Sequence, residues 1–262
     1  MNILDKIISH KREEVEVRKA TVPENELMQT KYFAVECLSL KESLLKENAT
    51  GIIAEFKRKS PSKGFINQHA DVLRVTSGYT KSGASGLSVL TDHEFFGGST
   101  EDLAIARANQ IPILRKDFII DPYQIVASKA MGADVILLIA ACLSVTEVKE
   151  LSSYARRLGL EVLLELHDED ELDRICDTVD MVGINNRSLK TFEVDIDRSL
   201  RLSKIIPAGK IKIAESGISD AATIKTFRDA GYKGFLIGET FMKEPLPEQA
   251  FEQFVNNIKL SI

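Results

Sequence analysis

The sequence predicts an α/β protein, a closed (β/α)₈ TIM barrel preceded by a helical extension. Three observations lead to this prediction. Eight short apolar runs recur along the 262 residues, helical patterns lie between them, and the first fifty residues fall outside the repeat. Apolar runs without polar alternation are typical of parallel strands that are covered on both faces. Strands and helices joined by short links form right-handed βαβ units, and eight such units close into a barrel.

The helical extension comes first in the chain. Apolar residues near the N-terminus recur at helical spacing, at Ile3, Leu4, Ile7 and Ile8. A heavily charged stretch follows as far as Lys19, and a second helix is expected around residues 39–46. We therefore expect one barrel domain over residues 1–262, with residues 1–50 as its extension. The pattern is compatible with a position under the barrel and equally with a position over its top.

The predicted strands are rich in Ile, Val and Leu. They cover residues 51–56, 86–90, 112–114, 134–141, 161–166, 181–184, 211–214 and 234–237. Between them, Ser144 and Glu147 have the spacing of a capping box, and Asp121 before Pro122 marks another helix start. Asp220 opens a further helix. A doubly wound open sheet is the alternative, but no GxGxxG motif follows the first strand to support it.

Composition and charge exclude several classes of protein. A content of 44% hydrophobic and 28% charged residues is ordinary for a globular chain. The net charge of -5 argues against nucleic-acid binding. The N-terminus reaches charge too soon for a signal peptide, and the longest apolar run, 135–143, is far too short for a membrane span. Three widely spaced cysteines without a CxxC pattern indicate free thiols in a reducing cytoplasm.

Polar residues stand at the C-terminal ends of several predicted strands, which is where such barrels place their chemistry. Glu55 and Lys57 follow the first apolar run, and strand alternation puts them on one face. Because buried charges are costly unless paired, this pair indicates a site, with a solvated charge run as the alternative. Other strand ends carry Lys116, Glu165, Asn185, Arg187 and Glu215. Ionisable residues at the ends of five strands favour a site.

Glycine-containing turns follow the seventh and eighth strands. They contain Ser216 with Gly217, and Gly238 with Glu239. These two loops form the usual phosphate site of such barrels, because backbone N–H groups and a helix N-terminus point at an anion there. A plain turn glycine is the alternative for either loop alone. We expect a phosphate group at this place, with Lys57 and Arg187 as the candidate cations.

Other kinds of chemistry have less support in the sequence. The four histidines show no metal-ligand spacing such as HExxH, so we predict no metal. No Walker A loop occurs, and no serine has an evident histidine partner. Lys116 is compatible with a Schiff-base lysine, since burial can depress a lysine pKa, and with a protonated general acid that carboxylates keep charged. The residues alone leave both roles open.

The motifs taken together resemble those of the indole-3-glycerol phosphate synthase family. The segment IAEFKRKSP at 53–61 resembles the strand-one signature, and LRKDF at 114–118 resembles the strand-three motif. Both are highly specific to this family. The resemblance continues through VLTD at 89–92, FFGGS at 95–99, Glu165, GINNR at 183–187, AESGI at 214–218 and the pair Gly238 and Glu239. It covers essentially the whole chain, including the helical extension.

The resemblance implies a lyase of tryptophan biosynthesis that needs no cofactor or metal. Its substrate would be 1-(2-carboxyphenylamino)-1-deoxyribulose 5-phosphate. Ring closure with loss of CO₂ and water would give indole-3-glycerol phosphate. The expected partner is this phosphorylated small molecule, with no nucleic acid and no membrane. The chain is expected to be a cytoplasmic monomer or at most a weak homodimer.

The resemblance also implies roles for the residues at the strand ends. Lys116 would be the general acid on the substrate carbonyl, and Glu165 the acid/base group of the dehydration. Lys57 would bind the substrate carboxylate, while Glu55 would position the lysines and pair with their charge. Two further residues would line the site and hydrogen-bond the substrate, Asn185 and Glu215. The phosphate would be held by Arg187, Ser216, Gly217, Gly238 and Glu239, the last three through their N–H groups.

An apolar wall is expected against the anthranilate ring, with simple core packing as the alternative role of its residues. The candidates are Phe95, Phe118, Leu137, Ile139 and Leu236. Some members of the family have Ser where this chain has Glu239, and we expect that carboxylate to turn away from the phosphate. The rival functions are phosphate barrels of the phosphoribosylanthranilate isomerase or tryptophan synthase α-subunit type, and a non-catalytic phosphosugar-binding barrel. The isomerase and α-subunit types would not need Lys57 together with Lys116, and the binding barrel would not need an acid/base pair.

Overall fold

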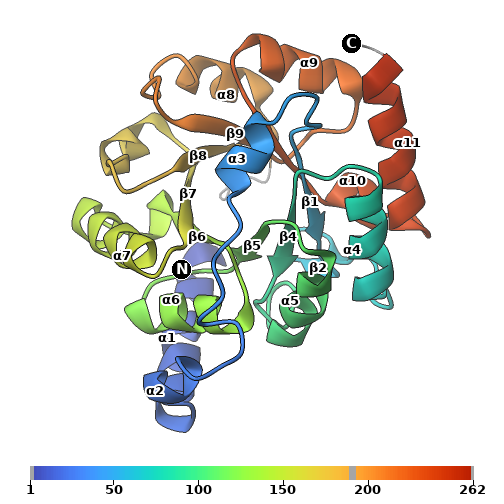
Figure 1. Cartoon of the computed structure of the whole chain (residues 1–262). Coiled ribbons are helices and arrows are strands. Elements are labelled where there is room, and N and C mark those ends of the chain that lie inside the picture. Colours follow the sequence, from blue (N-terminus) through green and yellow to red (C-terminus); the bar gives the residue numbers. More distant parts are fainter. Residues whose placement is uncertain (1–2, 189–192, 261–262) are drawn as a thin grey trace.

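Parallel strands form a closed ring in the computed structural model, which describes residues 3–188 and 193–260 (Figure 1). Each strand of the ring pairs with the next one along the chain, and the last strand pairs with the first. The strands are β1 (Ile52–Phe56), β4 (Gly86–Leu90), β5 (Ile113–Lys116), β6 (Val135–Ile139), β7 (Glu161–Leu166), β8 (Met181–Asn185), β9 (Ile211–Glu215) and β10 (Gly234–Ile237). The predicted (β/α)₈ class is confirmed.

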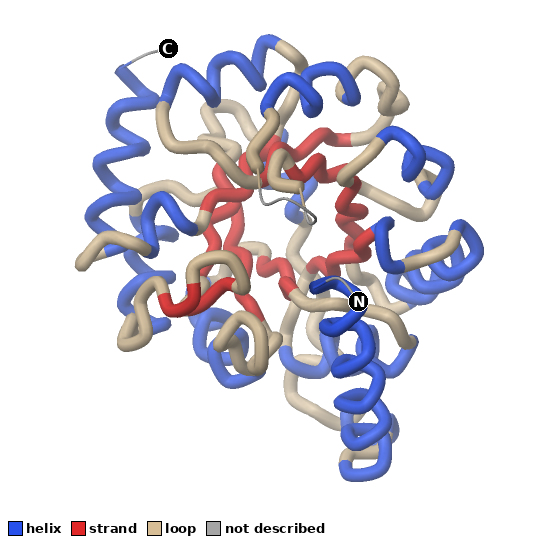
Figure 2. The backbone as a smooth tube through the Cα atoms, turned by 180° about the vertical axis from the view of Figure 1, so that it is seen from behind, coloured by secondary structure: helices blue, strands red, loops and turns tan. Residues whose placement is uncertain are grey.

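Helices surround the ring of strands on the outside (Figure 2). They are α4 (Val72–Lys81), α5 (Thr100–Ala106), α6 (Pro122–Met131), α7 (Val145–Arg157), α8 (Ile196–Leu202), α9 (Ala221–Asp229) and α11 (Pro247–Leu260), with the short α10 (Glu239–Met242). A 3₁₀ segment, Glu169–Arg174, lies between β7 and β8. The predicted capping box of Ser144 and Glu147 is present, and Asp121 and Asp220 accept hydrogen bonds as N-caps.

Strand residues alternate between two apolar clusters. Ile53 and Leu114 belong to a cluster inside the barrel, whereas their neighbours Ile52 and Ile113 pack against the helices. All five residues of β1 are buried, as expected for a strand covered on both faces. Glu55 therefore shares the inner face with Ile53 and lies at the end of the strand, where the apolar filling of the barrel stops.

The N-terminal extension occupies both ends of the barrel. Its helices are α1 (Ile3–Thr21), α2 (Glu24–Leu27) and α3 (Leu40–Leu45). Leu40 and Leu44 lie against Gly86 and Gly234, the first residues of β4 and β10, so α3 covers the bottom. The Glu161 carboxylate at the start of β7 accepts the N–H of Leu40 at 2.9 Å, which fixes α3 there. The first turn of α1, by contrast, lies at the rim of the opposite end.

The structure extends several predicted strands into their polar ends. Lys116, Asn185 and Glu215 are the last residues of their strands, because ladder hydrogen bonding continues where side chains turn polar. The predicted strand at 134–141 is shorter, since Ala140–Cys142 forms a 3₁₀ turn. A small hairpin of β2 (Lys59–Ser60) and β3 (Gly64–Phe65) follows β1 and was not predicted.

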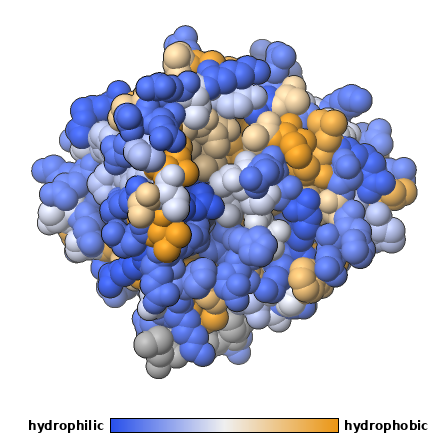
Figure 3. All heavy atoms as spheres, turned by 90° about the horizontal axis from the view of Figure 1, so that it is seen from below, coloured by the Kyte–Doolittle hydropathy of each residue, from blue (hydrophilic) through white to orange (hydrophobic). Residues whose placement is uncertain are grey.

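One face of the molecule is seen in Figure 3. It is mostly hydrophilic, with separate small apolar patches between hydrophilic residues. Within residues 3–188 and 193–260, no helix has the length and apolar character that crossing a membrane requires.

Candidate active site

A cavity opens at the C-terminal ends of the strands, and it brings together nearly all the residues predicted for the site. Those lining it are Glu55, Lys57, Lys116, Phe118, Leu137, Ile139, Glu165, Asn185, Arg187, Glu215, Ser216, Gly217, Leu236, Gly238 and Glu239. They come from seven strands and the turns that follow them. Barrel closure alone explains their meeting, because all the strands are parallel and end at one rim.

Lys116 lies at the centre of the charged part of this cavity. Its Nζ atom is 2.5 Å from Glu165 Oε2 on β7 and 3.2 Å from Glu215 Oε2 on β9. Both carboxylates are almost fully buried, at 3% and 2% exposure of their side chains. One ammonium therefore faces two carboxyl groups across the barrel mouth, and ionisable groups at this distance are strongly coupled.

The three groups shift one another's pKa values in different directions. Burial alone would lower the pKa of Lys116, but Glu165, Glu215 and Glu55 together raise it above its ordinary value, so this lysine is protonated at neutral pH. Burial would raise the pKa of Glu165, but the Lys116 charge and hydrogen bonding hold it well below its usual range. Burial, with the neighbouring Glu165 charge, raises the pKa of Glu215 to about 8 against the pull of Lys116. The Lys116 ammonium is thus paired with one ionised carboxyl group, Glu165, and one largely neutral carboxyl group, Glu215, at neutral pH.

Two further side chains contact Glu165. Asn185 Nδ2 donates to Glu165 Oε1 at 3.0 Å, and His167 Nε2 lies 3.1 Å from the same oxygen. His167 is buried and directly follows β7, two residues after Glu165. It was not predicted for the site, because nothing in the sequence marks it as a metal ligand or as the partner of a serine.

The second ion pair of the site is Glu55 with Lys57, joined at 2.6 Å. Glu55 lies directly beside Gly238, where an added Cβ would come within 2.4 Å of the Glu55 Oε1 atom. The space that Glu55 occupies therefore requires glycine at position 238, whatever ligand the N–H groups of this turn contact. Glu215 restricts position 183 in the same way, since a Cβ on Gly183 would lie 2.1 Å from Glu215 Oε1.

The turns after β9 and β10 lie side by side at one end of the cavity. Ser216 and Gly217 both have left-handed backbone, with φ of 66° and 69°. Left-handed φ is unusual for a serine, and buried Asn186 supports this turn by donating to the Ser216 carbonyl at 2.7 Å. Thr240 Oγ1 donates to the Ile218 carbonyl and ties the two turns together. Residues of both turns therefore line the cavity.

The Glu239 side chain lies at this end of the cavity, beside two cations. Its carboxylate lies 3.4 Å from Arg187 Nη2 and 3.7 Å from Lys63 Nζ, which attract it to the rim. That this carboxylate turns away from a bound phosphate stays a prediction. Lys63 comes from the hairpin after β1 and was not among the predicted residues.

An apolar wall faces the charged residues. Phe118, Leu137, Ile139 and Leu236 line it as expected, but Phe95 does not. The ring of Phe95 packs edge-on against His10, at 5.7 Å between centroids, and its neighbour Phe96 lines the cavity instead. These residues lie in a turn, where strand alternation no longer indicates which side chain faces inward.

Residues of α1 complete the wall and were missed by the sequence analysis. They are Ile3, Leu4 and Ile7. Their helical spacing identified an apolar face, but such a face predicts only that the residues are buried and not which surface they pack against.

In the described part of the chain, no group of three or more His, Cys, Asp or Glu residues is placed to hold a metal ion. The absence of a metal stays a prediction.

Comparison with known proteins adds independent evidence. The family model for indole-3-glycerol phosphate synthase matches residues 4–254. The indole-3-glycerol phosphate synthase of Bacteroides thetaiotaomicron is 47% identical over 259 residues, covering 98% of this chain and 99% of that protein. The protein of the same name from Salinibacter ruber is 45% identical over 257 residues, with 97% and 95% covered.

Solved structures with low sequence identity share the fold. A crystal structure of 3-hexulose-6-phosphate synthase from Salmonella typhimurium superposes with a TM-score of 0.63 at 12% identity, covering 81% of this chain and 100% of that one. At such identity, the likeness concerns the fold alone. The full-length match to the family model and the identity of the relatives go further: the chain belongs to the indole-3-glycerol phosphate synthase family.

Proposed function

We propose that this chain is an indole-3-glycerol phosphate synthase, a carboxy-lyase of tryptophan biosynthesis. It converts 1-(2-carboxyphenylamino)-1-deoxyribulose 5-phosphate into indole-3-glycerol phosphate, CO₂ and water. The observation that carries this proposal is the position of Lys116, whose ammonium lies between Glu165 and Glu215 and beside an apolar wall. A buried proton donor next to an aromatic pocket is what ring closure onto a carbonyl requires.

Ring closure is the first step that these residues serve. The aromatic carbon that carries the carboxylate attacks the ribulose carbonyl carbon, and negative charge develops on the carbonyl oxygen. Lys116 is protonated because of its carboxylate neighbours, and it donates a proton to that oxygen. Lys57 pairs with the substrate carboxylate and holds the ring for attack, while Glu55 keeps the Lys57 ammonium in place at 2.6 Å.

Loss of CO₂ and of water completes the reaction. The C–C bond to the carboxylate breaks, and its electron pair restores the aromatic ring. The hydroxyl group formed in the first step then leaves as water while a proton is lost from the adjacent carbon. We assign the acid/base role in this dehydration to Glu165, which Asn185 orients through its 3.0 Å hydrogen bond. Glu215 lines the same place and hydrogen-bonds the substrate's polar groups.

The phosphate group belongs at the turns after β9 and β10. Ser216, Gly217, Gly238 and Glu239 would contact it, the last three through backbone N–H groups. Arg187 supplies positive charge at the rim, and Lys57, which also lines the cavity, is the second candidate cation. The apolar side chains Phe118, Leu137, Ile139 and Leu236 would contact the anthranilate ring.

Further properties of the protein are proposed on the same basis. The whole chain acts as one domain, since the extension contributes to both ends of the barrel. Cys37, Cys142 and Cys176 are all free thiols, which fits a reducing cytoplasm. We propose a monomer without cofactor, binding only its phosphorylated substrate, with light scattering in solution as the test of its mass.

Turnover of the ribulose phosphate, followed by indole fluorescence, tests the proposal. The parent protein should form indole-3-glycerol phosphate. Arg187→Ala should raise KM markedly, because it removes a cation that binds the substrate phosphate. A protein that binds the substrate without forming an indole would favour the non-catalytic phosphosugar-binding barrel. An unaltered KM in Arg187→Ala, with the phosphate elsewhere in a crystal structure, would overturn the phosphate assignment.

A further inference from the structure

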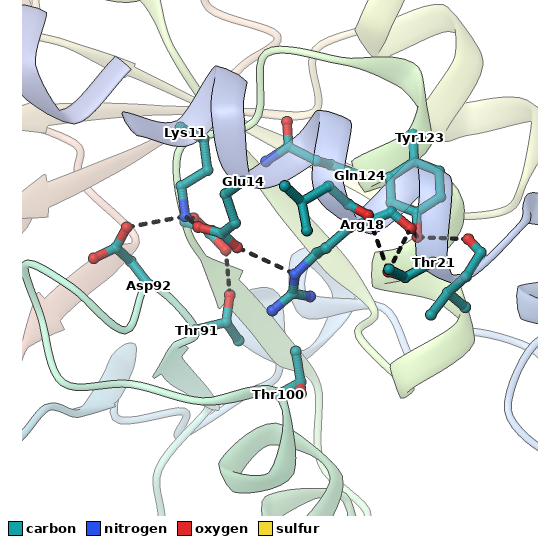
Figure 4. Close-up of polar contacts among 12 residues, drawn as sticks. Lys11, Glu14, Arg18, Thr21, Thr91, Asp92, Thr100, Tyr123 and Gln124 are labelled. Atoms are coloured by element: carbon teal, nitrogen blue, oxygen red, sulfur yellow. Dashed lines mark hydrogen bonds and ion pairs between the residues drawn. The ribbon is translucent and has the colours of Figure 1, made fainter. Parts of the chain in front are cut away.

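A buried lysine outside the proposed catalytic set connects α1 to the barrel. Lys11 is 1% exposed, although lysine is almost never fully buried unless it is paired. Its Nζ atom lies 2.9 Å from Asp92 Oδ2, 2.9 Å from Asp117 Oδ1 and 2.7 Å from Glu14 Oε2. Figure 4 shows the side chain pointing from α1 toward Asp92, beside Thr91. One ammonium therefore joins the helix to two different loops of the barrel mouth.

The two aspartates follow adjacent strands. Asp92 comes after β4, and its other oxygen accepts the N–H of Phe95 at 2.8 Å. Asp92 Oδ2 is buried and has no hydrogen-bond partner among the described residues, so its charge depends on the ion pair with Lys11. Asp117 comes directly after Lys116, the last residue of β5. Lys11 thus holds the end of β5 against the loop after β4.

The segment around Lys116 is fixed through Asp117. Asp117 Oδ2 accepts from Thr91 Oγ1 at 2.6 Å and from Arg115 Nη2 at 2.8 Å. The backbone N–H of Thr91 donates to the Lys116 carbonyl at 3.1 Å. Because strand side chains alternate, Arg115 points to the outside of the barrel, where its Nη1 atom donates to Ser128 Oγ on α6, while Lys116 points into the cavity. The contacts of Asp117 therefore set the backbone from which the Lys116 side chain projects.

The same lysine also sets the position of α1. Ile7 and Ile3 precede Lys11 by four and eight residues and lie on its face of the helix, where they line the cavity. The far end of α1 is held separately, by the Lys19–Asp121 pair at 2.6 Å. Lys11 is thus the ion-pair anchor of α1 next to the proposed active site.

We propose that Lys11 is a positioning residue for the reaction: its ammonium fixes Asp117, and through it the direction of Lys116, while it docks α1 over the cavity. This inference rests on the proposed synthase function, in which Lys116 is the proton donor. Small displacements of a catalytic group are costly, and about 1 Å can lower a rate by a factor of about 100.

The test compares Lys11→Met with Lys19→Met, which removes the half-buried ion pair between the same helix and Asp121. Lys11→Met should lower kcat for indole formation by a factor of about 10–100, because Lys116 loses its alignment. The affinity for inorganic phosphate should stay within about twofold, since that site is at the other side of the mouth. Lys19→Met should leave kcat unchanged, and Lys11→Arg should recover most of it, since a guanidinium can pair with both aspartates.

Folding is separated from positioning by a second variant. Lys11→Met leaves the buried Asp92 charge without its ionic partner, whereas Asp117 keeps Arg115, so Lys11→Met/Asp92→Asn replaces the unpaired charge by a neutral amide. This double variant should fold, as judged by circular dichroism, and should retain a lowered kcat. A folded variant with the parent's kcat, or one in which only KM rises, would overturn the positioning role. Failure of both variants to fold would likewise show that Lys11 acts in folding.

The parent protein decides whether the proposed function itself holds. If the parent forms no indole, the synthase function fails. If the parent turns over and Lys11→Met matches it, the function stands and only the role of Lys11 is lost.

Discussion

Lys116 places a positive charge between two buried carboxyl groups of the cavity. It is the last residue of its strand, 2.5 Å from one buried carboxylate and 3.2 Å from another. The sequence left two roles open for it, a neutral Schiff-base amine and a charged acid. The carboxylate neighbours raise its pKa, which favours the charged acid.

The first prediction concerns removal of this acid. Lys116→Ala should lower ring closure by a factor of about 10²–10⁴ or more, the usual contribution of a general acid. Inorganic phosphate should still bind within about twofold of the parent, because the turns after β9 and β10 are intact. Lys225→Ala serves as control, since Lys225 is exposed and pairs with Asp229 on the surface of α9. Unchanged turnover of purified Lys116→Ala would contradict the proposed role.

The second prediction concerns the pH dependence of stability. The pKa of Glu215 is raised from 4.5 to about 8, so between these values the folded protein holds a proton that the unfolded chain has lost. Stability contributed by this neutral group is therefore complete below pH 4.5 and is lost as pH rises toward about 8. Glu215→Gln is neutral at every pH, so its melting temperature should fall less than the parent's between about pH 5 and about pH 9. Parallel curves for the two proteins would be evidence that Glu215 is ionised throughout.

The third prediction concerns Glu239. In this structure its carboxylate pairs with Arg187 and Lys63, two cations at the rim of the cavity. A bound phosphate would compete with it for both. Glu239→Gln should therefore tighten binding of inorganic phosphate about two- to fivefold, equivalent to the roughly 0.5–1 kcal/mol of partly exposed charges. Titration calorimetry measures this directly. Weaker binding in Glu239→Gln would instead mean that the carboxylate aligns the cations for phosphate.

At the scale of secondary-structure elements, neighbouring strands fit around the buried carboxylates. Glu215 on β9 lies over Gly183 on β8, and Glu55 on β1 lies beside Gly238 after β10. Both glycines are needed for space, because a methyl group would overlap a carboxylate oxygen. The glycines after the strands were predicted as phosphate ligands, and packing gives one of them a second reason to be glycine.

The fourth prediction tests this fit. Gly183→Ala should displace Glu215, lower turnover and destabilise the fold by roughly 1–3 kcal/mol, the usual cost of overpacking. Gly209→Ala is the matched control, because no atom lies within 4 Å of its added Cβ. Thermal melting and turnover of both variants provide the measurement. Equal behaviour of the two variants would show that the strands adjust without moving Glu215.

The helical extension was predictable as helices, but its position on the barrel was not. The apolar face of α1 and the second helix were predictable from spacing, but their places were not. A helix buries an apolar stripe equally well under a barrel and over it. The structure uses α3 for the bottom and α1 for the mouth. Long-range ion pairs such as Lys11 with Asp92 and Asp117 decide the matter, and local periodicity does not contain them.

At the scale of the whole molecule, the sequence predicted the barrel and most of the cavity. Closure brings all strand ends to one rim, so a prediction of strands was also a prediction of which polar residues meet. Lys116, Glu165 and Glu215 were found in this way. Side chains in turns do not alternate regularly between two faces. For this reason the sequence predicted Phe95 for the apolar wall, whereas Phe96 lines the cavity.

The most direct test of the proposed function follows the carboxylate carbon of the substrate. The purified protein is incubated with 1-(2-carboxyphenylamino)-1-deoxyribulose 5-phosphate labelled with ¹³C in the carboxylate, and the products are quantified by mass spectrometry. We expect labelled CO₂ and unlabelled indole-3-glycerol phosphate in equal amounts, with both formed more slowly by Lys116→Ala by a factor of about 10²–10⁴ or more. Intact substrate after incubation with the folded parent protein, or an isomerised product that keeps the label, would contradict the synthase function.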